Sequence, residues 1–194
     1  MKRVILAGIL GGIVMFIWSW LAHDVLPLGD AGIKVLPNES SATAALQTAT
    51  ADKRGLYMFG LGLGENPTAE EKSKAMKEMN ERMAKSPSGL LMYHPAGRQV
   101  NMGQALGVEF ATECVETILA LFLLSQTILA GFVQKFGFVL VAGILAAIAT
   151  NVSYWNWYGF PKHYIGAYML IQVIGFALVG LIAAPLVRTR SSGA

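Results

Sequence analysis

Cysteine is almost absent from the sequence: Cys114 is the only one in 194 residues. A single thiol cannot form an intrachain disulfide or a thiolate metal cluster. Cys114 also lies within an apolar stretch, where a thiol is usually an unreactive packing group. The sequence therefore offers no catalytic cysteine and no disulfide framework.

Charge is also scarce. Only 14% of the residues are charged, whereas 54% are hydrophobic, and the chain contains 21 glycines. This composition excludes an ordinary soluble domain and indicates a chain that lies mostly in lipid. The formal net charge of +3 is not gathered in a basic patch interleaved with aromatic residues, so we expect no nucleic-acid partner.

Motifs of known enzymes are missing as well. The sequence contains no HExxH, no paired ExxH and no recognisable Ser/His/Asp order, which are the patterns that would predict a definite reaction. The sequence thus names no reaction and no cofactor, and it leaves open whether the protein is an enzyme.

Four apolar stretches are present instead, and each approaches the length of about 20 residues that a helix needs to cross a bilayer. They are Val4 to Ala22, Ala111 to Val133, Phe138 to Tyr154 and Tyr164 to Val187. The first exceeds the usual apolar region of a secretory signal and ends in a poor cleavage site, so we interpret it as a retained anchor. The fold class predicted is an α-helical integral membrane protein, a four-helix transmembrane bundle with a small external α+β cap.

Basic residues predict the orientation of this bundle. They lie at alternate ends of the apolar stretches, and they are Lys2, Arg3, Lys135, Arg188 and Arg190. The positive-inside rule then predicts cytoplasmic N- and C-termini in a multi-pass protein of the bacterial inner membrane. The predicted domains are transmembrane helix 1 at 1–22, a periplasmic cap at 23–105, and transmembrane helices 2 to 4 within 106–194.

The cap has its own pattern. Residues 66–68, Asn-Pro-Thr, are typical of a helix start, and Ser86-Pro87 of its end. The segments 55–59 and 89–93 share the pattern Gly-Leu-x-Met-aromatic and predict two paired strands. A further helix is expected over 39–53. Two strands are marginally stable alone, so we expect the cap to lean on the membrane helices or on a partner.

Three glutamates open the second apolar stretch. Glu109, Glu113 and Glu116 fall within about a 60° arc of one helix face. Ionisable groups inside a membrane are costly, so such a stripe is a functional-site hypothesis by default. If Val133 marks the inner boundary, Glu116 lies about 25 Å across a core of about 30 Å, and Glu113 lies near the outer boundary.

Other polar residues are expected at the same outer edge, and they define two candidate sites. The candidates for ligand binding or proton exchange are Glu109, Glu113, Glu116, Tyr154 and Trp155. The candidate metal ligands are His23, Asp24, Glu113 and His163. The alternatives are a hydrogen-bonded helix cluster without further function and an aromatic belt at the membrane interface.

Small residues recur at spacing four in three stretches, at Gly8/Gly12, Gly143/Ala147 and Gly180/Ala184. This pattern predicts faces where helices approach closely. Gln126 and Gln172 lie deeper, and we expect them to bond between helices and not to line a transport path.

Several segments resemble small uncharacterised bacterial inner-membrane proteins. They are the run from Met15 to His23, the elements Leu26-Pro27-Leu28-Gly29 and Leu36-Pro37-Asn38-Glu39, and the turn Trp155-Asn156-Trp157-Tyr158-Gly159-Phe160-Pro161. The resemblance implies the same topology and carries no activity.

The function predicted is an accessory or ligand-binding component with a polar site at the outer membrane edge. A membrane enzyme with a carboxylate/histidine metal or proton-transfer site is the first alternative. A small oligomeric transporter is the second. The expected partners are the lipid bilayer and a membrane protein or further copies of the chain.

Overall fold

The computed structural model describes residues 1–64 and 66–190, which form two compact units. Met1–Ile33 and the chain from Val100 onward form the first, called the helical unit here. Lys34–Gln99 form the second, called the cap. We describe each unit by itself.

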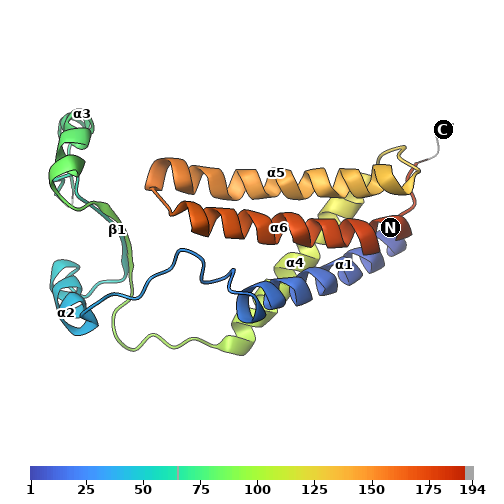
Figure 1. The fold of residues 1–194 in the computed structure, drawn as a ribbon, viewed down its shortest axis with the longest axis horizontal. Helices are drawn as coiled ribbons and strands as arrows, with labels where there is room; N and C mark the ends of the chain where they lie inside the picture. Colours follow the sequence, from blue (N-terminus) through green and yellow to red (C-terminus); the bar gives the residue numbers. More distant parts are fainter. Residues whose placement is uncertain (65, 191–194) are drawn as a thin grey trace. The chain divides into compact units, whose positions relative to one another are not determined.

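Four long helices make up the helical unit: α1 (Lys2–Trp20), α4 (Met102–Ser125), α5 (Phe132–Tyr158) and α6 (Lys162–Ile182). A π-helical turn, η1 (Leu21–Val25), extends α1. Figure 1 shows α5, α6 and α1 in that order, with α4 passing obliquely behind. The helices α1, α5 and α6 are long and apolar enough to cross a membrane. Helix α4 is continuous, but three glutamates interrupt its apolar sequence.

The second apolar stretch does not form one helix, which corrects the prediction of a span from Ala111 to Val133. Helix α4 ends at Ser125, and α5 begins at Phe132. The hydroxyl of Thr127 donates to the Leu124 carbonyl at 2.7 Å and accepts from the Leu129 amide at 3.3 Å. These side-chain bonds replace the helical pairing of the backbone, and the chain turns at the short polar run Ser125-Gln126-Thr127.

Helix α1 lies between α4 and α6, and the close approaches are at glycines. A Cβ atom added to Gly8 would lie 2.7 Å from the Ile118 Cα, and one added to Gly12 would lie 2.7 Å from the Cys114 Cα. No side chain fits at either position without movement of α4. The predicted packing face at Gly8 and Gly12 is therefore confirmed, and it brings α1 against α4 in antiparallel register.

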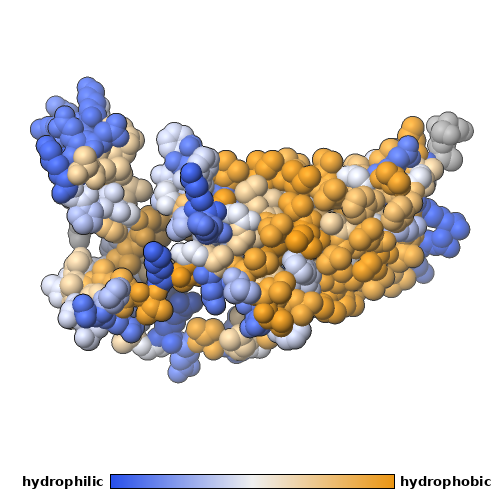
Figure 2. Space-filling view, in the orientation of Figure 1, coloured by the Kyte–Doolittle hydropathy of each residue, from blue (hydrophilic) through white to orange (hydrophobic). Residues whose placement is uncertain are grey.

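Helix α6 packs between α1 and α5. A Cβ at Gly175 would meet the Met15 side chain of α1, and a Cβ at Gly143 of α5 would meet Phe176. The largest fully buried apolar side chains of the helical unit are Leu121, Leu124, Val139, Val179 and Val187. Apolar residues also dominate the flank of the helical unit that Figure 2 presents, as expected of a surface that contacts lipid.

The cap contains α2 (Glu39–Ala49), β1 (Gly55–Phe59), α3 (Ala69–Lys85) and β2 (Gly89–Tyr93). The strands pair antiparallel, with Gly55 opposite Tyr93, so the prediction of two paired strands is confirmed. The helix start expected near residues 66–68 is confirmed, with Pro67 just outside α3: Thr68 is the cap residue, and Thr68 and Glu71 form a reciprocal capping box.

Candidate functional site

Glu113 lies near the middle of α4. Twelve residues separate it from Ser125, where the helix ends, which corresponds to about 18 Å along the axis. The packing register gives a second measure, because the neighbouring Cys114 faces Gly12, ten residues or about 15 Å from the start of α1 at Lys2. Both counts place Glu113 about halfway along its helix. Because α4 ends at Ser125, Val133 does not belong to the helix that carries Glu113, and a depth counted from Val133 does not apply.

Burial differs sharply along the glutamate stripe. The Glu113 side chain is buried, with 6% of its surface exposed, whereas Glu116 is half-buried and Glu109 is exposed. Glu113 is therefore turned toward the interior of the helical unit, whereas Glu109 is turned outward. Helix α1 provides the wall beside Glu113, and Ser19 is its polar neighbour there.

One oxygen of the Glu113 carboxyl has no partner. Its Oε2 atom is buried and lacks a hydrogen bond among the described residues. A buried polar atom left without a partner costs about 1–3 kcal/mol, and more if the group is charged. Such atoms are uncommon in folded proteins and call for a specific explanation, and a ligand, an ion or a proton would each supply the missing partner.

Thr117 fixes the helix pair one turn further along α4. Its fully buried hydroxyl lies 2.7 Å from the Gly8 carbonyl of α1 and 2.8 Å from the Glu113 carbonyl of its own helix. The close approach at Gly8 and Gly12 makes this bond between helices possible. Glu113 therefore sits on a backbone that is held against α1.

His23 lies in η1, the π-helical turn that follows the C-terminal end of α1. Its Nδ1 donates to the Ser19 carbonyl at 2.8 Å, and its ring meets Tyr168 of α6 edge-on at a centroid distance of 5.7 Å. Ser19 therefore supports His23 through its backbone and borders Glu113 through its side chain.

An aromatic row continues from Tyr168 along α6. Tyr168 and Tyr164 lie 4.4 Å apart, Tyr164 and Phe160 5.5 Å, and Phe160 and Tyr154 5.3 Å between ring centroids. The structure thus brings one predicted ligand-site residue, Tyr154, into the same row as His23. Trp155 is outside these ring contacts and is 44% exposed, as suits the membrane interface.

The proposed metal ligands are not gathered into a centre. Within residues 1–64 and 66–190, no group of three or more His, Cys, Asp or Glu side chains is placed to hold a metal ion. His163 is exposed and lies five residues from Tyr168, about 140° around α6, so it faces away from His23. The structure therefore gives the predicted set of His23, Asp24, Glu113 and His163 no support.

Sequence reasoning missed Ser19, Thr117, Tyr164 and Tyr168. The two tyrosines have a signal, because they repeat at spacing four on the face of α6 that continues to Ile171, whose carbonyl accepts a 2.8 Å bond from the Trp18 indole. No such sequence signal marks Ser19 and Thr117, since their roles depend on which helix is packed beside them.

The two glutamines predicted to bond between helices occupy different places. Gln172 of α6 accepts a bond from the Thr150 hydroxyl of α5 at 3.3 Å, as predicted. Gln126 lies at the C-terminal end of α4, where Arg190 donates to its side-chain oxygen. Both glutamines therefore join segments of the helical unit.

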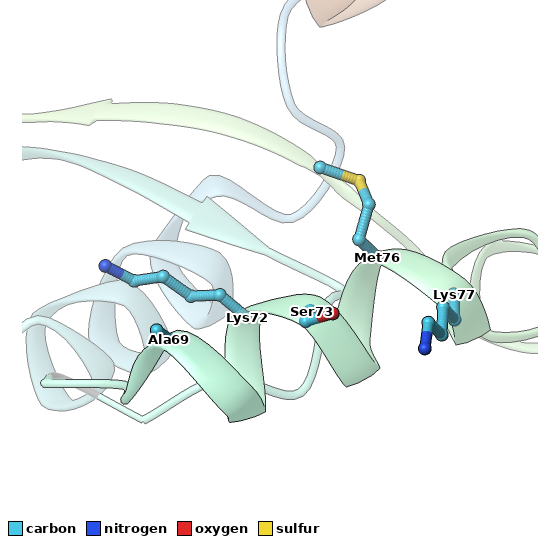
Figure 3. A pocket seen from close by; sticks show the side chains of 5 residues that line it. All are labelled: Ala69, Lys72, Ser73, Met76 and Lys77. Atoms are coloured by element: carbon cyan, nitrogen blue, oxygen red, sulfur yellow. The ribbon is translucent and has the colours of Figure 1, made fainter.

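A shallow hollow on the cap is a weaker candidate site. It is lined by residues from one face of α3 alone: Ala69, Lys72, Ser73, Met76 and Lys77. Figure 3 shows the Lys72 and Lys77 side chains pointing in different directions, with their nitrogen atoms at opposite ends of the hollow, so their charges do not converge on a common point. A hollow without convergent polar groups lacks the features of a ligand site.

No protein family model, curated protein or solved structure matches the chain. Functional inference therefore depends on the residues and their geometry.

Proposed function

We propose that the protein is a four-span integral protein of the bacterial inner membrane, with α4 as the fourth span. Three observations support α4 as a span. It has 24 residues, or about 36 Å. It packs antiparallel on α1, from Ile118 against Gly8 to Phe110 against Phe16. One of its three glutamates, Glu113, is turned inward. A helix packed along a transmembrane helix in this way shares its membrane environment.

The basic end of the helical unit is the proposed cytoplasmic end. The Lys135 ammonium bonds to the Val187 carbonyl at 2.6 Å, and the Arg190 amide donates to the Thr127 carbonyl at 2.8 Å. These contacts bring the turn between α4 and α5 together with the C-terminal segment. The N-terminus starts at the same end, because α1 and α4 are antiparallel. The positive-inside rule makes this the cytoplasmic side.

Within this topology, we assign the protein a ligand-binding, accessory role, with Glu113 as the binding group. The observation that carries the proposal is the buried, unpartnered Oε2 atom in the middle of the membrane helix. A carboxyl in that position is completed by a hydrogen-bond donor or a cation. The ligand class is therefore a molecule that carries an N–H, O–H or cationic group.

The glutamate stripe also supports entry from the periplasmic side. Glu109 is one helical turn closer to that end than Glu113 and is exposed. Acidic groups in succession favour cations over anions along the route. Glu116 lies on the cytoplasmic side of Glu113 and is half-buried, so the stripe is most open at its outer end.

Purification in mild detergent tests the proposal. Native mass spectrometry, lipid extraction and elemental analysis would identify what accompanies the wild-type protein and three matched variants, Glu109→Gln, Glu113→Gln and Glu116→Gln. We expect a bound species that Glu113→Gln loses and Glu109→Gln retains. A bound species kept in full by Glu113→Gln, or none in wild-type protein reconstituted from its own membrane lipids, contradicts the proposal.

Carbodiimide labelling gives a second readout that does not require the ligand to be known. An apolar carbodiimide enters the membrane and reacts with a protonated carboxyl, whereas a water-soluble one with glycine ethyl ester reaches exposed carboxyls. We expect the first reagent to label Glu113 and the second to label Glu109, as located by peptide mass spectrometry. Labelling of Glu113 by the water-soluble reagent alone would place it in water and refute a membrane site.

A further inference from the structure

The two-stranded sheet of the cap has one covered and one open face. Paired residues share a face, and faces alternate along a strand. The face formed by Leu56, Met58, Leu90 and Met92 is entirely apolar. Leu56 is 66% exposed, Met58 57% and Met92 70%. Four large apolar side chains on one small sheet, three of them mostly exposed, form a patch that calls for a cover.

The opposite face is held by the turn that follows α2. The Tyr57 hydroxyl donates to the Lys53 carbonyl at 2.7 Å, and the Tyr93 hydroxyl donates to Asp52 at 2.7 Å. Tyr93 is buried. One face of the sheet is thus bonded to the rest of the cap through its tyrosines. The other face, formed by Leu56, Met58, Leu90 and Met92 and called the sheet patch below, is exposed.

Positive charge adjoins the sheet patch at one end. Arg54 directly precedes β1 and His94 directly follows β2, and the alternation places both on the side of Leu56 and Met92. Desolvation and the charges of Arg98 and Arg54 lower the pKa of His94, so the two arginines lie close to it. The patch is thus an apolar surface with a cationic end.

We propose that the sheet patch docks on the surface of the lipid bilayer, with Arg54 and Arg98 at the level of anionic headgroups. Apolar side chains inserted at the headgroup boundary, together with basic residues beside them, are the pattern of interfacial membrane binding. The cap is joined at both of its ends to the helical unit, so a weak surface affinity suffices to keep it docked. The proposal is independent of Glu113.

A second copy of the chain fits the patch less well. A stable interface between proteins involves about 20–30 residues a side, and the sheet patch offers four large side chains. A bilayer has no such size requirement, because each inserted side chain contributes separately.

Fluorescence quenching in the full-length protein tests the docking. In a Cys114→Ala background, Met92→Cys is labelled with an environment-sensitive fluorophore, and Ser73→Cys on α3 is the matched control. The protein is placed in nanodiscs of phosphatidylethanolamine and phosphatidylglycerol that contain spin-labelled lipid. We expect several-fold stronger quenching at position 92 than at position 73, with blue-shifted emission at 92 only.

A charge placed in the patch provides the decisive comparison. Leu56→Glu should reduce quenching at position 92 markedly, and hydrogen exchange of the β1 and β2 amides would verify that the sheet stays paired. Equal quenching at 92 and 73, quenching at 92 that Leu56→Glu leaves unchanged, or crosslinking of position 92 between two copies without quenching would each overturn the proposal.

Discussion

The helical unit and the cap are stabilised in different ways. In the helical unit, α1 contacts α4 and α6 through glycines so close that a Cβ atom would collide with the neighbouring helix. In the cap, only Thr50, Ala75 and Tyr93 are buried among the described residues. Its structure is held by hydrogen bonds: a capping box, the paired strands and two tyrosine hydroxyls. Packing between elements determines the first unit, and local bonds determine the second.

This contrast follows from the two environments. Helices in lipid gain nothing from hiding apolar side chains from one another, so close backbone contact and buried hydrogen bonds decide how they associate. A water-exposed segment needs a buried core, and two strands with two helices provide little. Changes at helix contacts should therefore have large effects, and changes in the cap small ones.

The largest effect is expected for Gly12→Val. The new Cβ would lie 2.5 Å from the Cys114 Sγ and 2.7 Å from its Cα, and the backbone of α4 can yield only by moving away. We expect a destabilisation of at least about 1–3 kcal/mol, with a lower thermal midpoint and less monodisperse protein. Gly166→Val is the control, because a Cβ there meets nothing within 4 Å among the described residues. Equal behaviour of the two variants would contradict the α1/α4 contact.

Thr117→Val should have the next largest effect. The change keeps the shape of the side chain and removes the donor to the Gly8 carbonyl. Hydrogen bonds between membrane helices average about 0.6 kcal/mol and reach about 1.7 kcal/mol. Thr112→Val is the matched control, since that hydroxyl bonds only to Val108 of its own helix. In mixed detergent, the free energy of unfolding should be lower for Thr117→Val than for Thr112→Val. The reverse order would exclude a stabilising bond between the helices.

A smaller effect is expected for Tyr93→Phe, which loses the bond to Asp52. That bond also raises the pKa of Tyr93, so the folded cap holds the phenolic proton above pH 10 where the unfolded chain releases it. Stability from this group is therefore complete below pH 10 and declines as pH rises through the folded pKa. Amide exchange of β1 and β2 should accelerate in Tyr93→Phe and lose this alkaline dependence. Unchanged protection would place the stability of the cap elsewhere.

The contrast between the two units also explains which structural features the sequence predicted correctly and which it did not. The strands 55–59 and 89–93 and a helix start near residues 66–68 were predicted correctly because turn and capping signals act locally. The end of α4 was not predicted, because the polar run Ser125-Gln126-Thr127 is short enough to lie within an apolar span, and the side-chain bonds of Thr127 form only in the folded turn.

The candidate site divides in the same way. The shared face of the glutamates follows from helical periodicity alone, and the burial of Glu113 agrees with it. The depth counted from Val133 loses its reference point, because α4 ends at Ser125. The neighbours Ser19 and Tyr168 were missed because they come from α1 and α6, whose register with α4 is set by glycine contacts that one sequence cannot rank.

The smallest effect is expected at the start of α3. Glu71 accepts bonds from the Thr68 amide at 2.7 Å and the Thr68 hydroxyl at 2.9 Å, and these lower its pKa from 4.5. The ionised carboxylate thus stabilises the folded cap above the pKa of the unfolded chain, and this stability is lost as pH falls through the folded pKa. Because glutamine also completes a capping box, Glu71→Gln should keep α3 at neutral pH and reduce its acid fraying. Amide exchange of Ser73 and Lys74 between neutral pH and pH 3 would measure it. Glu70→Gln, in the same turn but outside the box, should fray like the wild type, and equal acid sensitivity of all three proteins would show that the box does not limit the first turn.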